Sequence, residues 1–311
     1  MNFLVIGEPC VDEIHKADGA TIKSYGGILY STIAMAVLCK KGDTVTPLIN
    51  LGGDEFDAIT GILKKYPNIR TDGIKKCSHP TRKVYLQYSP GDADKHARME
   101  NSTEPTYELS FEWIEGFLSS GDAMLINMIS GVDISIETLK RIRKYFPNYI
   151  HIDIHNIVME TRDDGSRIHR YVENWHEWCT QTDTVQMNEF EAATISRDKK
   201  NEYEVASDIL LDPHSKVKGL MVTRGKQGVT AFVKKEKSYQ DSSFIDLDRH
   251  DLNAIENPHF ADSTGCGDVF ASSFTIEYSQ SKDIMKAINF ANRKASFNSS
   301  LAGLDELVKL K

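Results

Sequence analysis

Short apolar runs alternate with helical patterns along most of the chain, and this alternation constrains the fold more than any other feature. The runs with the length and composition of buried strands are Phe3–Ile6, Thr46–Ile49, Ala123–Asn127, Tyr149–Ile154, Thr184–Met187 and Gly219–Val222. The segments between them with helical spacing are Ile28–Cys39, Glu55–Tyr66, Ile136–Phe146 and Glu202–Leu211. Strands separated by helices pair in parallel, so the sequence predicts an α/β fold with a mostly parallel central sheet.

Two regions depart from this alternation. Residues 77–108 contain one strand-like stretch, Lys83–Tyr88, followed by a polar segment without a convincing helix, which predicts an inserted β flap or lid. Beyond Gly228 the pattern changes to short strand-like segments, Val229–Val233 and Ser243–Leu247. Two final helices are expected at Gly267–Tyr278 and Asp283–Ser299.

Composition narrows the class of protein. With 311 residues, 40% of them hydrophobic, the chain is long enough to bury a large core. A net charge of -8 offers no global positive field for a polyanion, so nucleic acid is not expected as a partner. The five cysteines form no C-x-x-C pair, and no apolar run is long enough to cross a membrane. These features predict a cytoplasmic protein with reduced thiols and no membrane partner.

The stretch ADSTGCGDVFASSF, residues 261–274, carries the clearest chemical signal. Gly265, Cys266 and Gly267 directly precede an apolar helix, where backbone N–H groups can bind an anion and glycines allow close approach. Asp268 follows in the first turn. An anion hole beside a carboxylate suits phosphoryl transfer to an alcohol, with Asp268 as the base. The alternative is a tight turn followed by an ordinary helix N-terminal charge.

The segment DSTGCGD, residues 262–268, resembles the C-terminal signature D-T-x-G-A-G-D of the ribokinase (PfkB) family of sugar and nucleoside kinases. The resemblance implies a ribokinase-like three-layer α/β/α fold, formed by residues 1–311 as one kinase domain. It also implies a small β lid made of approximately residues 12–25 and 79–108. Within this family Asp268 would be the catalytic base, and the amides of Gly265, Cys266 and Gly267 would form the anion hole.

Further segments resemble the family in the same order along the chain, and three of them concern the substrate. FLVIGEPCVDEI resembles the first strand, whose closing acid, here Asp12, holds substrate hydroxyls. YGGILYSTIAMAVL resembles the glycine-pair signature and would place Gly26 and Gly27 beside the substrate. INLGGDEF resembles the region that would place Asp54 near it.

The remaining segments concern the phosphate donor. QMNEFEA contains N-x-x-E at Asn188 and Glu191, which in the family organises Mg²⁺, although the same spacing is a helix-capping pattern. VTRGKQG would place Thr223 and Gly225 near phosphate and ribose, and Asn292 would border the adenine. The implied cofactors are ATP and Mg²⁺, with a monovalent cation such as K⁺ left open.

The expected activity is ATP-dependent phosphorylation of a primary hydroxyl of a sugar. A nucleoside kinase is the nearest alternative, since Tyr30 and Tyr85 offer rings for stacking a base, and a non-catalytic metabolite-binding protein on a kinase fold is the alternative from another class. The family asparagine after the glycine pair is replaced here by Ser31, with bulky Tyr30 before it, which argues against a ribose-specific pocket. A homodimer is left open.

Charged and polar residues of the lid region bear on the acceptor. Arg82, Lys83 and Arg98 are candidate contacts for an acidic or phosphorylated substrate. Polar side chains favour a hydroxylated acceptor over a flat base; they are Asp92, Asp94, Lys95, His96 and Arg98.

Two other features admit a chemical interpretation. In HIDIHN, residues 151–156, the side chains of His151, Asp153 and His155 share one face of a strand, which leaves open a metal site or a place near substrate and phosphates. Cys266 is interpreted as a substitute for alanine in a crowded turn, where only its backbone N–H is needed, and a reactive thiol whose pKa the helix N-terminus lowers is left open as the alternative.

Overall fold

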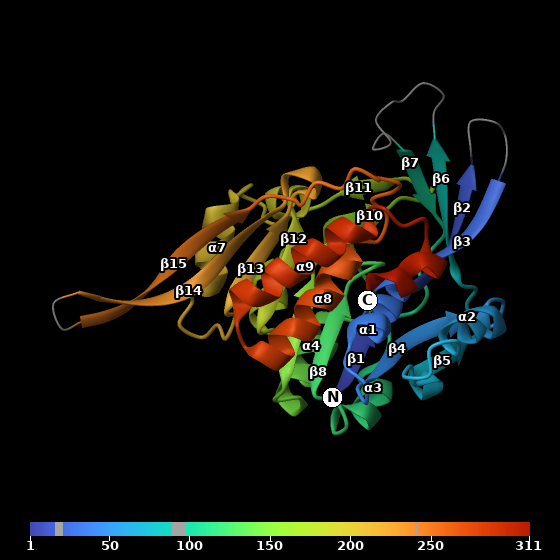
Figure 1. Cartoon of the computed structure of the whole chain (residues 1–311), viewed down its shortest axis with the longest axis horizontal. Helices are drawn as coiled ribbons and strands as arrows, with labels where there is room; N and C mark the ends of the chain where they lie inside the picture. The colour runs from blue at the N-terminus through green and yellow to red at the C-terminus, as the bar shows by residue number, and fades with distance from the viewer. Residues whose placement is uncertain (16–20, 89–97, 240–241) are drawn as a thin grey trace.

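The computed structural model describes residues 1–15, 21–88, 98–239 and 242–311. A large sheet lies at the centre of the molecule (Figure 1). The strand order is β15-β14-β13-β12-β9-β8-β1-β4-β5. The strands are β1 (Asn2–Ile6), β4 (Thr44–Gly52), β5 (Ile74–Cys77), β8 (Ala123–Asn127), β9 (Tyr149–Asp153), β12 (Thr184–Asn188), β13 (Gly219–Thr223), β14 (Val229–Tyr239) and β15 (Ser242–Leu252). Pairing is parallel from β13 to β5 and antiparallel at β14 and β15. The predicted α/β class is confirmed.

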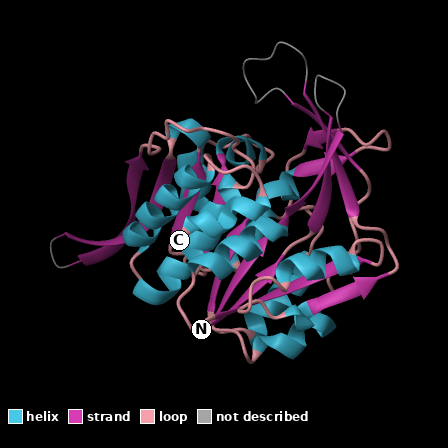
Figure 2. Ribbon diagram, turned by 45° about the vertical axis from the view of Figure 1, so that its right-hand side comes forward, coloured by secondary structure: helices cyan, strands magenta, loops and turns pink. Residues whose placement is uncertain are grey.

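Helices cover both faces of this sheet and make three layers (Figure 2). One face carries α1 (Ile28–Leu38), α2 (Phe56–Leu63), α8 (Cys266–Ser281) and α9 (Ile284–Asn298). The other carries α3 (Phe111–Leu118), α4 (Ile136–Tyr145), α5 (Trp175–Thr180), α6 (Glu189–Thr194) and α7 (Glu202–Leu210). Each face has its own cluster of buried apolar side chains, so the strands are apolar on both sides, as parallel strands require.

A second, smaller sheet of order β3-β2-β6-β7 stands beyond one end of the central sheet (Figure 1). Its strands are β2 (Pro9–His15), β3 (Thr21–Gly27), β6 (Arg82–Tyr88) and β7 (Arg98–Ser102). They come from the two segments for which the sequence predicts a lid. Asp12 does not close the first strand, as the resemblance suggested, because β1 ends at Ile6 and Asp12 lies within β2.

Helices α1 and α8 pack against each other in the middle of one face. Both are buried on nearly all sides, which explains why their sequences show little amphipathic contrast. Hydroxyl groups inside α8 bond back to carbonyls of the preceding turn, as Thr275 Oγ1 does to Ala271 O at 2.8 Å. Ser272 Oγ donates to Ser31 O at 2.9 Å and thereby links the two helices.

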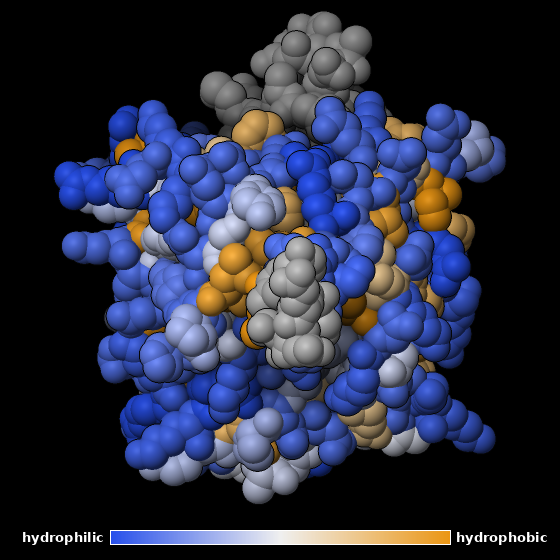
Figure 3. Space-filling view, turned by 90° about the vertical axis from the view of Figure 1, so that its left-hand side faces the viewer, coloured by the Kyte–Doolittle hydropathy of each residue, from blue (hydrophilic) through white to orange (hydrophobic). Residues whose placement is uncertain are grey.

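The hairpin of β14 and β15 is longer than the sequence predicts. The expected strands Val229–Val233 and Ser243–Leu247 each extend to 11 residues. The extension is charged, and its Lys–Asp pairs form across the strands at 2.6 Å for Lys235–Asp248 and 2.5 Å for Lys237–Asp246. These charges obscured the strand pattern, and the face that the hairpin points from is largely hydrophilic (Figure 3).

Short elements complete the fold: η1 (Thr71–Gly73), η2 (His155–Val158), β10 (Met159–Thr161), β11 (Arg167–His169), η3 (Gly225–Gln227) and η4 (Leu304–Leu310). Within the described ranges, no helix has the length and apolar character needed to cross a membrane.

Candidate active site

Asp268 lies in the first turn of α8 and points toward the ends of α1 and β8. Its Oδ1 accepts hydrogen bonds from Asn127 Nδ2 at 2.7 Å and from Ser31 Oγ at 3.3 Å. Burial raises the pKa of Asp268 to about 6, the two hydrogen bonds oppose that rise, and the charge of Asp12 adds to it. The carboxylate is therefore ionised at pH 7 and able to take a proton.

The turn before α8 has the strained backbone that its glycines permit. Gly265 has φ 75°, in the left-handed region, and Cys266 N–H donates to Ser263 O at 3.2 Å. Asn298 Nδ2 holds the turn from α9 by donating to Thr264 O at 3.0 Å. The Cys266 amide, one of the three expected to form the anion hole with those of Gly265 and Gly267, is thus engaged within the turn. The amides of Gly267 and Asp268 belong to the first helical turn, where N–H groups lack a partner within the helix and can bind an anion.

A cavity of about 810 Å³ opens beside this turn and gathers most of the predicted donor residues. Those lining it are Thr223, Gly225, Cys266, Gly267 and Asn292. Much of the remaining wall is apolar, formed by Ile255, Pro258, Phe260, Phe270 and Ala295 among others. The cavity thus has an anion-binding end at α8 and an apolar part bordered by α9.

Two further buried acids, Asp153 and Glu191, lie close enough to Asp268 or to each other for their charges to interact. Asn188 and Glu191 form a capping box at the start of α6, with Glu191 Oε2 accepting from the Asn188 N–H at 2.7 Å. Burial raises the pKa of Glu191, and burial together with the charges of Glu191 and Asp268 raises the pKa of Asp153. Burial destabilises the ionised form of these carboxyl groups, so a cation bound nearby would stabilise them.

Gln186 connects this acidic region to the turn. Its Nε2 donates to Asp153 Oδ2 at 2.9 Å and to Gly267 O at 3.2 Å. Among the described residues no group of three His, Cys, Asp or Glu side chains is arranged to hold a metal by itself. A hard cation would therefore need phosphate and water oxygens in addition to these side chains, which is how Mg²⁺ usually binds.

The glycine pair and Asp12 meet on the other side of Asp268. A Cβ atom on Gly26 would lie 2.3 Å from Asp12 Oδ2, so only glycine leaves room for this carboxylate. Gly27 is the N-cap of α1 with φ 61°, a conformation that favours glycine. Asp12 is 8% exposed, and its charge acts on Asp268. The structure brings these predicted substrate residues close to the predicted base.

Asp54 occupies a different position from these residues. Its Oδ1 accepts from Thr81 N at 3.0 Å and Thr81 Oγ1 at 2.9 Å, at the entry to β6. Asp54 therefore braces the base of the small sheet.

Arg82 is buried inside the protein, so it is neither an exposed contact for an acidic substrate nor the solvated loop arginine that the sequence also allowed. It is 2% exposed, its Nη1 lies 3.6 Å from Glu8 Oε2, and its Nη2 donates to Ser102 Oγ at 2.9 Å. Lys83 pairs with Glu13 at 3.4 Å. Residues 92–96 lie outside the described residues, as does the side chain of Arg98.

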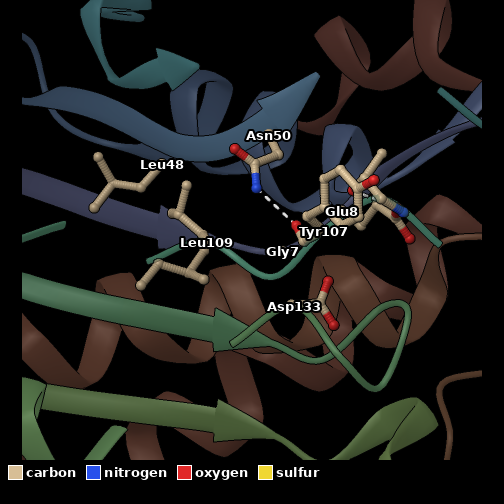
Figure 4. Close-up of a pocket in the computed structure, with 9 residues that line it drawn as sticks. Gly7, Glu8, Leu48, Asn50, Tyr107, Leu109 and Asp133 are labelled. Atoms are coloured by element: carbon tan, nitrogen blue, oxygen red, sulfur yellow. Dashed lines mark hydrogen bonds between the residues drawn. The ribbon is translucent and has the colours of Figure 1, made fainter. Parts of the chain in front are cut away.

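Glu8 also lines a small cavity whose wall contains both polar and apolar residues (Figure 4). Asp133 lines the same cavity, and Asn50 Nδ2 donates to Tyr107 O at 2.7 Å across it. Burial raises the pKa of Glu8 to about 7 and that of Asp133 to about 6. The accessible volume of about 10 Å³ admits about one water molecule.

The structure bears on two alternatives that the sequence left open. His151 is fully buried, its Nδ1 contacts Thr184 Oγ1 at 2.8 Å, and burial lowers its pKa to about 3, so it is a neutral core residue. Burial raises the pKa of the Cys266 thiol to about 11, which agrees with its interpretation as a substitute for alanine and argues against a reactive thiol.

Asn127 and Gln186 are the contacts that sequence reasoning missed. Each lies at or near the carboxyl end of a buried strand and is less than 2% exposed. The available signal was a polar residue ending an apolar run, at the sheet edge where ligands of α/β proteins bind.

The chain matches the family model described as pfkB family carbohydrate kinase over residues 150–308. A search of curated proteins finds no match. Among solved structures, a pyrophosphate-dependent kinase in the ribokinase family superposes with a TM-score of 0.73 at 16% identity, covering 97% of this chain and 96% of that one.

Two further solved structures are similar over nearly the whole chain. Fructokinase with bound ATP from Xylella fastidiosa has a TM-score of 0.73 at 14% identity, with 99% of this chain and 97% of that one covered. Burkholderia thailandensis nucleoside kinase in complex with inosine has a TM-score of 0.72 at 12% identity, with 99% and 94% covered.

Proposed function

The chain belongs to the pfkB family of carbohydrate kinases, and on that basis we propose that it transfers the γ-phosphate of ATP to a primary hydroxyl of a sugar. The observation that carries the proposal is the position of Asp268. Its ionised carboxylate stands in the first turn of α8, near enough to Asp12 for the two charges to interact, and Asp12 abuts Gly26 of the glycine pair. A base and an anion site within one helical turn suit attack by an alcohol on a phosphoryl group.

The proposed mechanism assigns one task to each of these groups. Asp12 accepts a hydrogen bond from a hydroxyl of the sugar and orients it. Asp268 takes the proton of the attacking sugar hydroxyl while the hydroxyl oxygen bonds to the γ-phosphorus. The bond between the γ-phosphorus and the oxygen that bridges it to the β-phosphate breaks, and ADP leaves with that oxygen. The amides of Gly267 and Asp268 stabilise the negative charge on the transferred group.

Magnesium, when bound with the nucleotide, supplies neutralisation of phosphate charge. The residues that would hold it are Glu191 and Asn188, since Glu191 is a buried acid whose charge acts on Asp153, and Gln186 links Asp153 to Gly267 in the first turn of α8. Buried acids facing phosphates would repel them unless a cation lay between.

The donor cavity favours a nucleotide over pyrophosphate, which one structural neighbour uses. Its apolar wall, including Phe260 and Ile255, lies beyond the anion-binding end and would contact a base that pyrophosphate lacks. Phe260 and Ile255 are 40% and 47% exposed, and a bound base would cover them. We therefore expect ATP to support turnover and pyrophosphate to do so far less.

The test is phosphoryl transfer with ATP or pyrophosphate, at millimolar Mg²⁺, over a panel of sugars and nucleosides. The expected result is transfer from ATP to a sugar with the highest kcat/KM of the panel. A much higher kcat/KM with adenosine or inosine would favour a nucleoside kinase. This alternative is tested because one similar solved structure is a nucleoside kinase in complex with inosine. Nucleotide binding with no turnover on any acceptor would favour a metabolite-binding protein.

A further inference from the structure

Tyr30 lies in the first turn of α1, directly before Ser31, which bonds to Asp268. It is 5% exposed, and its ring packs against the turn before α8. A Cβ atom on Gly265 would lie 2.2 Å from Tyr30 Cδ1, so the ring and the turn are in direct contact. Tyr30 therefore spans the distance between the glycine-pair helix and the turn that precedes the predicted base.

The hydroxyl end of Tyr30 faces an acidic environment. Burial raises the pKa of this phenol, and the carboxylates of Asp12, Asp262 and Asp268 raise it further, so all three are near enough to act on it. The phenol stays protonated and can donate a hydrogen bond. The ionised Asp12 and Asp268 only accept hydrogen bonds, and Asn127 and Ser31 already donate to Asp268, so the Tyr30 phenol adds a donor that is not engaged by that carboxylate.

We propose that Tyr30 is a specificity-determining residue for the acceptor, whose hydroxyl donates to an acceptor oxygen near the hydroxyl that is phosphorylated. This inference rests on the proposed function and narrows its substrate class. The acceptor that fits is a neutral polyol, with one hydroxyl donating to Asp12, one giving its proton to Asp268, and one oxygen accepting from Tyr30. Three carboxylates around this point repel an acceptor that already carries phosphate.

The ring of Tyr30 adds a steric limit to the chemical one. Because the ring is packed against Gly265 and almost fully buried, it presents no open face on which a base could stack. It fills space between α1 and the turn that a smaller residue would leave to the acceptor. Tyr30 is thus expected to exclude large acceptors and to favour compact ones.

The test compares Tyr30→Phe and Tyr30→Ala with the full-length wild type. Phe keeps the ring on Gly265 and removes only the hydroxyl, so kcat/KM for the best polyol should fall about three- to tenfold, as for one lost hydrogen bond. Monodeoxy analogues of that polyol are assayed alongside. For the analogue that lacks the oxygen contacted by Tyr30, the Phe variant and the wild type should be equal. Tyr30→Ala should raise kcat/KM for bulkier acceptors relative to the compact one.

The control is Tyr278→Phe, which removes a phenol that is 4% exposed and packs in the core against Phe274. It should leave the acceptor profile unchanged, and ATP affinity should be the same in all variants that fold. Equal kcat/KM of wild type and Tyr30→Phe for every acceptor and analogue would overturn the inference while the kinase assignment stood.

A protein without turnover still tests Tyr30 through binding. If polyols bind without being phosphorylated, the proposed function fails, and a three- to tenfold weaker Kd in Tyr30→Phe would support the contact on its own. Unchanged Kd values, or transfer to sugar phosphates as efficient as to free sugars, would contradict it.

Discussion

Asp268 combines two properties at the scale of a single residue: it is buried, and it is charged at neutral pH. Its pKa of about 6 exceeds the value of 3.8 for an unperturbed aspartate, because burial outweighs the hydrogen bonds from Asn127 and Ser31. A base must be ionised to accept a proton, so activity should be lost as pH falls through about 6.

The first prediction is the pH profile of kcat/KM. In the wild type the acid limb should have a midpoint near pH 6. In Asn127→Ala the limb should move to higher pH, since the lost hydrogen bond favoured the charged form of Asp268. Rate measurements between pH 5 and 9 check this, and an acid limb that stays in place would show that Asn127 does not position the base.

The second prediction concerns Asp268→Asn. The amide cannot take the hydroxyl proton, so kcat should fall by about two to four orders of magnitude. Stability should behave oppositely. Because the folded pKa of Asp268 lies above the unfolded value, the ionised form destabilises the fold, and this cost grows as pH rises from about 4 to 6. Above pH 6 the variant should therefore melt no lower than the wild type.

Cys266→Ala is the matched control, because its side chain contributes no base. It should keep near wild-type kcat, and the wild-type thiol should alkylate slowly at pH 7, as its raised pKa requires. A variant Asp268→Asn with wild-type kcat and a lower melting point would reduce Asp268 to a helix charge.

At this scale the sequence was sufficient to predict that Asp268 lies in the first turn of a helix directly after Gly265 and Gly267, because one contiguous segment carries the proposed base and the turn. It was insufficient for Asn127 and Gln186, whose contacts with α8 cross 141 and 81 positions of the chain. Such contacts depend on strand order, which periodicity does not encode.

Among the elements, two neighbouring helices begin with the same device and allow a clean comparison. Asn188 and Glu191 cap α6 beside the donor cavity, and Asn201 and Glu204 cap α7 away from the predicted base. Both boxes satisfy orphan N–H groups at a helix start. Capping alone therefore explains the spacing at each, and a metal role needs separate evidence.

The third prediction uses this pair. Glutamine can replace glutamate in a capping box, so Glu191→Gln and Glu204→Gln should both keep their helices. If Glu191 also helps to hold Mg²⁺, its variant alone should need more Mg²⁺ for half-maximal activity. Mg²⁺ titrations of kcat on both variants check this, and identical curves for the two would leave Glu191 with capping only.

The elements that were predicted well are those with simple patterns. Buried parallel strands such as β8 are continuous apolar runs, and α4 has strong helical spacing. The predicted strands of the β14–β15 hairpin were too short, because its outer half has cross-strand charge pairs in place of an apolar face. The order of strands in the sheet had no signal in any single segment.

On the scale of the whole molecule, a buried ion pair lies where the chain passes from one sheet to the other. Arg82 of β6 reaches Glu8, which lies in the short connection between β1 and β2, and Thr106 Oγ1 donates to Glu8 Oε1 at 2.6 Å. The nearby charge of Asp133 raises the pKa of Glu8 further. Removing the cation would leave buried acids without compensation.

The fourth prediction is that Arg82→Met lowers the free energy of unfolding by about 3 to 5 kcal/mol, measured by urea denaturation at pH 8. Glu8→Gln in the same chain should restore part of the loss. As the exposed control, Arg70→Met breaks the pair with Asp72, where both side chains are about half exposed, and should cost less than about 1 kcal/mol. Equal losses for Arg82→Met and Arg70→Met would show that the buried pair carries no special weight.

The same cluster has a pH signature. The folded pKa of Glu8, about 7, lies above its unfolded value, so its contribution to stability is greatest at low pH and is lost as pH rises toward 7. In Arg82→Met the loss should continue to higher pH, because Arg82 lowers the pKa of Glu8. Melting curves between pH 5 and 9 distinguish this from a purely steric effect.

The hydrogen bond from Ser272 to Ser31 joins the helix that begins at the glycine pair to the helix that carries Asp268. If donor and acceptor bind as proposed, the donor contacts α8 and the acceptor contacts the start of α1, and these two helices are packed together. The distance that the phosphoryl group must cross is therefore set when the chain folds. Catalysis would then need no sliding of one half past the other, and only the small sheet would remain to open and close. Such an enzyme should lose activity on heating together with its core.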